Sequence, residues 1–331
     1  MEEDRWTVDT LLKTSGSFWE ACTLHAAVAL EIFTLIGDDL LSAEEVAEKL
    51  AGDVRGTTML LNGLAAMGLL TQQEGTYANS AASKTFLIKE SPQYMGHIIQ
   101  HHHHLVDAWF RLPEAVKTGK PVRERSSHSE EEERESFLMG MFNLARGIAP
   151  DVAEQVDLTG RRHLLDLGGG PGTYAIHFCL ANHQLDATVY DLPTTQPFAL
   201  KTIEQFGLTG RIDFAGGDYL HEEIPGYYDV AWLSHILHGE GAEDCQKIID
   251  KTVSVLDAGG LILIHDFILD DTMDSPLFPA LFALNMLVNT PNGQSYSEMQ
   301  IADMLKAAGV SNITRLPFKG PNDSGIMKGV V

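Results

Sequence analysis

Cysteine and basic side chains are scarce in this sequence. Its 331 residues include 3 cysteines, Cys22, Cys179 and Cys245. They are far apart and match no metal-binding or redox spacing, which predicts a reducing, cytoplasmic setting. The chain has 23 Lys and Arg against 46 Asp and Glu. A formal net charge of −23 disfavours binding to nucleic acid and to anionic membranes.

Long apolar runs are also missing. The most apolar early stretch, Ala26 to Ile36, is far too short to cross a bilayer, and it contains Glu31. The acidic start, MEEDRWTVDT, lacks the basic and then apolar pattern of a signal peptide. We therefore expect a soluble cytoplasmic protein, and 331 residues are enough for two domains.

The first hundred or so residues have mainly helical spacing. Apolar positions predict a helix over Thr7 to Ile36 that stops at Gly37. In LSAEEVAEKL, Ser42 and Glu45 have the spacing of a capping box at the start of another helix. A further helix is predicted over residues 57–70. Its expected apolar stripe consists of Leu60, Leu61, Leu64 and Met67.

A short hairpin is predicted after this helix. TQQEGTYANS turns at Gly75 and leads into an extended piece that ends near Phe86. Helix, helix and hairpin is the order of a winged helix, a fold that binds DNA or mediates dimerisation. Contact with DNA phosphates needs Lys and Arg side chains. Near the expected recognition helix the only basic residue is Arg55, and the acidic Asp53 lies close to it in the sequence. We therefore predict a helical, winged-helix-like packing or dimerisation domain over residues 1–105.

The next part of the chain is expected to bridge two halves. SSHSEEEERES, Ser126 to Ser136, predicts a solvated loop that places Glu130 to Glu133 near the positive start of a helix. That helix is predicted over Glu135 to Val156. Its apolar positions at four-residue spacing are Phe137, Met141 and Ala145. We predict bridging helices over residues 106–157.

From Arg161 onward, short apolar strands alternate with helical stretches. This order indicates an α/β, Rossmann-like sheet, mostly parallel and covered by helices on both faces, over residues 158–331. NITRLPF and GIMKGVV have only a loop between them, which predicts an antiparallel pair at the end. The expected parallel strands are His163–Leu167, Ala187–Tyr190, Ile212–Phe214, Tyr228–Leu233 and Leu261–Asp266.

LLDLGGGPGTYA, residues 164–175, joins the first of these strands to a helix. Its glycines allow a ligand to approach the backbone where a doubly wound sheet binds nucleotides. The dinucleotide fingerprint G-x-G-x-x-G is not met, because residue 173 is Thr, and the lysine of a P-loop is missing. The expected ligand is therefore a nucleoside without a pyrophosphate. The motif D-x-G-x-G-x-G consists of Asp166, Gly168, Gly170 and Gly172.

Two more acids follow the next two strands. Asp191 in VYDLP can accept hydrogen bonds from both ribose hydroxyls, and Asp218 in GGDYL is placed for the exocyclic amine of adenine. Any one of these acids could instead cap a helix. Together with Asp166 they suit a ligand that has an amino group, two hydroxyls and a cationic sulfur. S-adenosyl-L-methionine is that ligand.

The chain resembles the small-molecule O-methyltransferases of the plant caffeate and animal acetylserotonin type and their bacterial relatives. LLDLGGGPGTYA, VYDLP, GGDYL and SHILHGEGAEDC occur in the family's order and spacing. The resemblance covers nearly the whole chain. It implies a class I methyltransferase sheet with an antiparallel last strand, and a homodimer formed through the N-terminal winged-helix domain. The implied S-adenosyl-L-methionine site consists of Asp166, Gly168, Gly170, Gly172, Asp191, Leu192, Asp218, Tyr219 and Ser234.

WLSHILHGEGAEDC contains two histidines one helical turn apart, His235 and His238. A neutral imidazole is the usual general base for a hydroxyl proton, although either ring could simply pack in place. The resemblance singles out His238 as the base and leaves His235 as a structural partner. The family's orienting glutamate corresponds to Asp266, which is one methylene shorter. A third acid of many members corresponds to Ser295, and Glu298 is out of register.

An acceptor pocket is expected between the bridging helices and the sheet. The resemblance implies an apolar site for an aromatic or polyketide-like molecule. The side chains that would line this pocket could equally well be ordinary core residues. The implied pocket residues are Phe137, Met141 and Met286.

The run HIIQHHHH contains a second group of histidines. On a helix, His97, His101 and His104 share a face, and three imidazoles can hold a transition metal. A solvated or pocket-lining histidine face is the interpretation we favour, and we predict no metal.

These observations predict an S-adenosyl-L-methionine-dependent enzyme that methylates a hydroxyl of a small aromatic or natural-product acceptor. Three alternatives stay open. A C- or N-methyltransferase on the same scaffold would not need His238. A nicotinamide oxidoreductase is disfavoured by the glycine spacing, and a ligand-sensing winged-helix regulator by the acidic N-terminal region.

Overall fold

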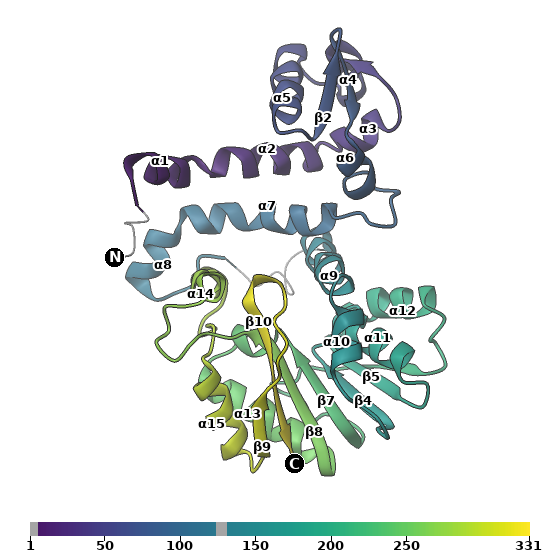
Figure 1. Cartoon of the computed structure of the whole chain (residues 1–331), viewed down its shortest axis with the longest axis vertical. Coiled ribbons are helices and arrows are strands. Elements are labelled where there is room, and N and C mark those ends of the chain that lie inside the picture. The colour runs from purple at the N-terminus through teal and green to yellow at the C-terminus, as the bar shows by residue number, and fades with distance from the viewer. Residues whose placement is uncertain (1–5, 124–130) are drawn as a thin grey trace. The chain divides into compact units, whose positions relative to one another are not determined.

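The computed structural model describes residues 6–123 and 131–331. The predicted loop over residues 126–130 therefore lies outside the described residues. The chain divides into two compact units, one of residues 1–106 with 135–143 and one of residues 107–134 with 144–331. Figure 1 labels many of their helices and strands.

The first unit is mainly helical and contains a small antiparallel sheet with the strand order β1-β3-β2. Helix α7 continues into the second unit, and residues 135–143 of α9 (Glu131–Arg146) also belong to the first unit. Its elements are α1 Val8–Gly16, α2 Phe18–Ala29, α3 Ile32–Ile36, β1 Leu41–Ser42, α4 Ala43–Leu50, α5 Val54–Ala66, β2 Leu70–Gln73, β3 Thr76–Asn79, α6 Ala81–Phe86 and α7 Gly96–Phe110.

The prediction of one helix over residues 7–36 is wrong, because three helices occupy that stretch. The second break has a clear backbone cause: Glu31 has a φ of 54°, a left-handed conformation that cannot continue a right-handed helix. Gly37 ends α3 as expected. Its φ is 56°, and its N–H donates to the carbonyl of Phe33.

The capping box at the start of α4 is confirmed. The Ser42 hydroxyl accepts from the Glu45 amide at 3.3 Å, and the Glu45 carboxylate accepts from the Ser42 amide at 2.7 Å. Helix α5 begins at Val54, earlier than predicted, because Asp53 caps it by accepting from the Gly56 amide at 2.8 Å. The local polar sequence therefore decides where both helices start.

Two predictions in this region are wrong. The apolar stripe of α5 is narrower than expected, since Leu61 and Leu64 are buried whereas Met67 is 37% exposed. The extended piece does not reach Phe86 either, because β3 ends at Asn79. Ser80 then caps α6 by accepting from the amide of Ser83.

The second unit contains a seven-stranded sheet with the order β6-β5-β4-β7-β8-β10-β9. Strands β4 to β8 are mutually parallel, and β10 pairs antiparallel with both β8 and β9, so the predicted antiparallel end is confirmed. The strands are β4 His163–Leu167, β5 Asp186–Asp191, β6 Ile212–Gly216, β7 Tyr228–Ser234, β8 Leu256–Phe267, β9 Ser311–Arg315 and β10 Ser324–Val330.

Helices precede these strands and alternate with them along the chain. The prediction of a single helix over residues 135–156 is wrong, because α9 ends at Arg146 and α10 restarts at Ala149. Pro150 fits the first turn of a helix but not its interior. The helices are α8 Leu112–Thr118, α9 Glu131–Arg146, α10 Ala149–Gln155, α11 Thr173–Ala181, α12 Gln196–Gln205, α13 Ala242–Ser254, α14 Leu277–Asn289 and α15 Glu298–Ala307.

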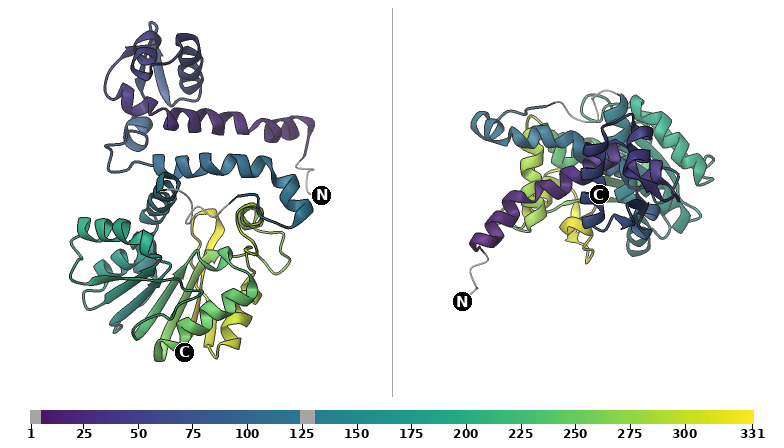
Figure 2. Two further views of the ribbon diagram at one scale, coloured as in Figure 1. Left: turned by 180° about the vertical axis from the view of Figure 1, so that it is seen from behind. Right: turned by 90° about the horizontal axis from the view of Figure 1, so that it is seen from above.

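Alternate strand residues face the two sides of the sheet. One side, with Leu164 and Trp232, packs against α10, α11 and α12. The other side, with Leu165 and Leu233, packs against α13 and α15, which lie in front of the strands in the view from behind (Figure 2). The parallel strands have their carboxyl ends at one common edge. In the described part of the chain, no helix combines the length and the apolar character needed to cross a bilayer.

Candidate active site

The glycine turn after β4 depends on glycine at particular positions. Gly168, Gly170 and Gly172 have φ values of 64°, 54° and 77°, a region that side chains strongly disfavour. A Cβ on Gly168 would lie 2.5 Å from the side chain of Ile236, in the loop after β7. A Cβ on Gly170 would meet nothing within 4 Å. The turn therefore packs closely against one loop and presents bare backbone to open space.

Asp166 is a buried carboxylate that supports the glycine turn through a bond to α11. It is only 1% exposed, and its Oδ2 accepts from the Ala175 amide in α11 at 3.1 Å, while Oδ1 has no hydrogen-bond partner. Burial raises the pKa of Asp166 to about 7, and the nearby charge of Asp191 acts in the same direction. The bond to Ala175 opposes this shift. Asp166 thus ties β4 to the first turn of α11, which is the capping role the sequence left open.

Asp191 connects the end of β5 to the glycine turn. Its Oδ2 accepts from the Gly170 amide at 2.8 Å, and its Oδ1 accepts from the Leu192 amide at 2.7 Å and the Thr195 hydroxyl at 3.0 Å. Burial raises the pKa of Asp191, and these three donors oppose the shift. The carboxylate is held in one orientation beside the turn. Thr195, four residues further on, was not identified from the sequence.

The loop after β6 contains Asp218 and Tyr219. The Asp218 carboxylate accepts from the Leu220 amide at 2.8 Å, so it shapes its own loop. The Tyr219 hydroxyl donates to Glu240 at 3.3 Å, which links this loop to the one after β7. Glu240 is a buried acid, 5% exposed, that sequence reasoning missed. Its place in HGEG, three residues before the acids that open α13, gave no signal of burial.

Ser234, at the end of β7, belongs to a buried polar chain. Its hydroxyl lies 3.0 Å from Nδ1 of His265, whose Nε2 lies 3.1 Å from the Ser324 hydroxyl on β10. His265 is completely buried, and burial lowers its pKa well below the usual value. Its imidazole is therefore neutral and bridges two hydroxyls. No pattern in the sequence singles out this histidine.

His238 and Asp266 form a close pair. Nδ1 of His238 lies 2.7 Å from Oδ1 of Asp266, and the His238 amide donates to Oδ2 at 3.3 Å. The Phe267 amide also donates to Oδ1, at 2.8 Å. Burial acts to raise the pKa of Asp266, but His238 and His235 outweigh it and hold that pKa well below the usual range. The ionised carboxylate therefore fixes Nδ1 of His238 as a donor and leaves Nε2 to accept a proton.

His235 faces the same carboxylate. The prediction that His235 and His238 lie one turn apart on a helix is wrong. His235 has a φ of 57°, and only Leu237–Gly239 form a short 3-10 helix, η3. Nδ1 of His235 lies 3.5 Å from Oδ1 of Asp266. One ligand atom from each of these three side chains falls within 4.8 Å of the others, as a metal site requires. Oδ1 of Asp266 also accepts from the Phe267 amide.

Three phenylalanines lie next to this pair. The Phe282 ring packs edge-on against His238 with centroids 4.8 Å apart, and the Phe267 ring lies 4.9 Å from Phe278 and 4.7 Å from Phe282. Phe278 and Phe282 are four residues apart on α14 and so share a face. Sequence reasoning missed this aromatic wall. The spacing in LFPALFALNML was the available signal.

The predicted pocket residues fall in different units. Met286, one turn beyond Phe282 on α14, is 7% exposed. Phe137 and Met141 belong to the first unit and are half-buried, with the Phe137 ring 5.3 Å from that of His101. A pocket that includes all three therefore stays a prediction.

The third acid of the plant-type arrangement has no counterpart at Ser295. This residue is 1% exposed, and its hydroxyl donates to the Pro279 carbonyl at 2.8 Å. Glu298, which is out of register in the sequence, pairs with Arg315 at 3.2 Å. Asp266 is the carboxylate next to the histidines.

The described contacts of the α7 histidines are with a side-chain amide and with aromatic rings. Nε2 of His104 lies 3.1 Å from the amide nitrogen of Gln100, and the ring of His97 packs against Tyr94 with centroids 5.3 Å apart. Within residues 6–123 and 131–331, the His235, His238 and Asp266 group is the one with metal-site geometry.

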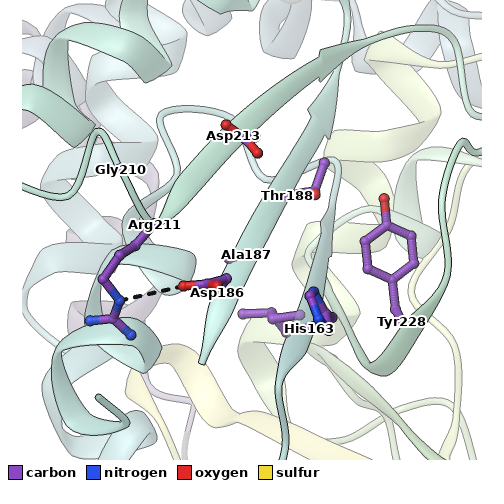
Figure 3. Close-up of a pocket in the computed structure, with 9 residues that line it drawn as sticks. His163, Asp186, Ala187, Thr188, Gly210, Arg211, Asp213 and Tyr228 are labelled. Carbon is purple, nitrogen blue, oxygen red and sulfur yellow. Dashed lines mark ion pairs between the residues drawn. The ribbon is translucent and has the colours of Figure 1, made fainter. Parts of the chain in front are cut away.

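A polar hollow opens at the opposite, amino end of the parallel strands (Figure 3). Arg211 lies beside it, 3.6 Å from Asp186, and donates to the carbonyls of Cys179 and Asn182 at 2.9 and 2.8 Å. Because these bonds use the guanidinium to close loops, and because doubly wound sheets bind ligands at the carboxyl ends, we assign the hollow a structural role.

The glycine turn, the acids at successive strand ends and the histidine–carboxylate pair together define a nucleoside-binding enzyme of the doubly wound class. Residues 112–311 match the O-methyltransferase domain, and residues 12–89 match the O-methyltransferase dimerisation domain. The chain belongs to the O-methyltransferase family, as the resemblance predicted.

The similar proteins span almost the full chain. The 3-hydroxy-5-methyl-1-naphthoate 3-O-methyltransferase of Streptomyces sahachiroi is 34% identical, over 97% of this chain and 94% of that protein. The tetracenomycin polyketide synthesis 8-O-methyl transferase TcmO of Streptomyces glaucescens is 31% identical, over 96% and 95%. The structure of PigF with SAH, a protein of Serratia sp., is 27% identical, covers 98% of this chain and 100% of that one, and superimposes with a TM-score of 0.90.

Proposed function

We propose that this enzyme transfers a methyl group from S-adenosyl-L-methionine to a hydroxyl of a small aromatic acceptor. The observation that carries the proposal is the His238–Asp266 pair, 2.7 Å apart, at the sheet edge that also holds the glycine turn and Asp191. The names of the similar proteins support it. Two of them are O-methyltransferases of a naphthoate and of a tetracenomycin polyketide, and PigF is named as S-adenosyl-L-methionine-dependent.

The residues at this edge fit the cofactor. Gly170 faces open space, and its amide bond to Asp191 joins the turn to the acid that would hold the ribose hydroxyls. Leu192 follows β5, and Asp218 and Tyr219 follow β6, its neighbour in the sheet. Ser234 ends β7, which pairs with β4 on the other side of the glycine turn. When bound, the cofactor supplies the methyl group as a sulfonium. Asp166 is buried, so its part is to brace the turn.

His238 would act as the general base. Asp266 accepts the Nδ1 proton and so keeps Nε2 free to take the proton of the acceptor hydroxyl. The resulting imidazolium is stabilised by the same carboxylate, which stays ionised. Alignment of the hydroxyl with the methyl donor would supply a large part of the acceleration. The chain's own residues therefore orient the acceptor and move one proton.

The acceptor is expected to be flat and aromatic. Phe267, Phe278 and Phe282 line the side of the histidine pair, and their rings favour edge-on or offset contact with another ring. We also propose that Phe137, Met141 and Met286 contribute to this pocket.

We further propose that the enzyme works as a cytoplasmic homodimer. The match of residues 12–89 to a dimerisation domain supports the dimer. Three free cysteines agree with a reducing compartment. The predicted division into residues 1–105, 106–157 and 158–331 belongs to the same proposal.

The test is the change His238→Ala, assayed with S-adenosyl-L-methionine and 3-hydroxy-1-naphthoate-type acceptors. We expect kcat/KM to fall about 1,000-fold, while the affinity for S-adenosylhomocysteine, measured by calorimetry, stays unchanged. His183→Ala, an exposed histidine on another loop, is the matched control. Intact turnover in His238→Ala would reject the base and favour C- or N-methylation.

A further inference from the structure

His235 has an unusual backbone for a residue with a side chain. It follows the last residue of β7, and its φ of 57° is in the left-handed region that non-glycine residues rarely occupy. Its amide donates to the carbonyl of His265 at 2.8 Å, which holds this conformation in place. Strain of this kind persists where the surroundings enforce it, and it is common at functional sites.

The side chain of His235 is held on both faces. Its ring centroid lies 4.5 Å from that of His265 and 4.5 Å from that of Phe267. These contacts direct Nδ1 toward Asp266 and leave the side chain 25% exposed, compared with 13% for His238. The ring is thus oriented by packing while one edge stays open.

Asp266 is shared by two histidines. Its Oδ1 lies 2.7 Å from Nδ1 of His238 and 3.5 Å from Nδ1 of His235. Nδ1 of His235 makes no hydrogen bond at this distance, but a polar N–H placed there would still draw charge from the carboxylate and weaken its hold on His238. The titratable groups next to His235 are His238 on η3 with His265 and Asp266 on β8, and α14 adds phenylalanine rings.

We propose that His235 is a positioning residue for the base, which shares Asp266 with His238 and makes His238 release its proton more readily between turnovers. The inference rests on the proposed role of His238. It assigns a function in proton transfer to a residue that the sequence left as a structural partner. No proton passes through His235 in this proposal. Its effect is carried by the carboxylate that both rings face.

The experiment compares His235→Phe with His235→Asn. Phenylalanine keeps a ring between His265 and Phe267 but has no N–H. Asparagine tolerates a positive φ and offers an amide donor. Measurements are kcat and KM for the acceptor across pH 5 to 9, the affinity for S-adenosylhomocysteine, and the melting temperature. His183→Phe, at an exposed position, is the control.

In His235→Phe, Asp266 interacts with His238 alone. It therefore stabilises the protonated form of His238 more strongly. We expect the acid limb of kcat/KM to move up by about half a pH unit and kcat at pH 7 to fall by at most about threefold, the most that this shift allows. KM and the affinity for S-adenosylhomocysteine should change less than twofold. His235→Asn should return the limb toward the wild-type position.

A wild-type pH profile in His235→Phe overturns the proposal. So does a loss of kcat without a shift of the limb, because a merely structural role predicts that result. If His235→Phe fails to fold, His235→Gly replaces it, since glycine accepts the backbone but lacks the donor. The acid limb of the kcat/KM profile should then shift in His235→Gly and not in His235→Asn. If the two variants have the same acid limb, the proposal is rejected. Loss of turnover in His238→Ala combined with a neutral His235→Phe would reject this inference alone and leave the proposed function intact.

Discussion

Two groups of histidines can be compared within this chain. On α7, His97 and His101–His104 are close in sequence, yet their described contacts are with rings and an amide. His235, His238 and His265 come from two separate segments, and two of them face the carboxylate of Asp266. The comparison indicates that a nearby buried acid, and not the number of imidazoles, prepares histidines for proton transfer.

Removing that acid should have the largest effect. Asp266→Asn keeps the size of the side chain but loses the charge that fixes Nδ1 of His238 as a donor. We expect kcat/KM to fall by a factor on the order of 1,000 in a steady-state assay, with little change in the affinity for S-adenosylhomocysteine. Glu298→Gln, which breaks only the half-exposed pair with Arg315, is the control. Equal losses in both variants would contradict the special role of Asp266.

His265 should make the stability of the second unit depend on pH. Its pKa is well below the usual value when folded because it is buried, so below about pH 6.5 the unfolded chain binds a proton that the folded one does not. Stability should therefore fall as pH drops below that point, by up to about 1.4 kcal/mol per pH unit. Urea unfolding of wild type and His265→Asn between pH 7 and 5 measures this. An unchanged slope in the variant would assign the effect to other groups.

The smallest effect is expected on α7. His103 is exposed and packs edge-on against His25 with ring centroids 5.7 Å apart. We expect His103→Gln to change kcat/KM less than twofold, within the error of a steady-state assay, because the described contact of this ring is with another imidazole and not with an acid. A tenfold loss in this variant would break the comparison between the two groups.

Much of the second unit could be predicted because its signals are local. Short apolar runs flanked by turn residues identified the parallel strands, and the D-x-G-x-G-x-G motif identified the turn after β4. The helix breaks at Glu31 and near Pro150 were missed, since apolar periodicity continues across both. A break set by a single backbone conformation leaves little trace in such a pattern.

The missed parts of the site depend on contacts between distant residues. His265 meets Ser324 on β10 across 59 positions, and the buried Glu240 is bonded to Tyr219 from the loop after β6. The sharing of Asp266 by two histidines follows from the left-handed backbone at His235. No single stretch of sequence reports such meetings, because the sheet order brings the segments together.

The position of β10 between β8 and β9 constrains how this end of the sheet can assemble. Strand β9 precedes β10 in the chain, yet it pairs with β10 and not with β8. It can therefore join the sheet only once β10 is paired with β8. The contact of His265 with the Ser324 hydroxyl, at the start of β10, forms with that same pairing, so the edge of the sheet and the buried polar chain are completed together.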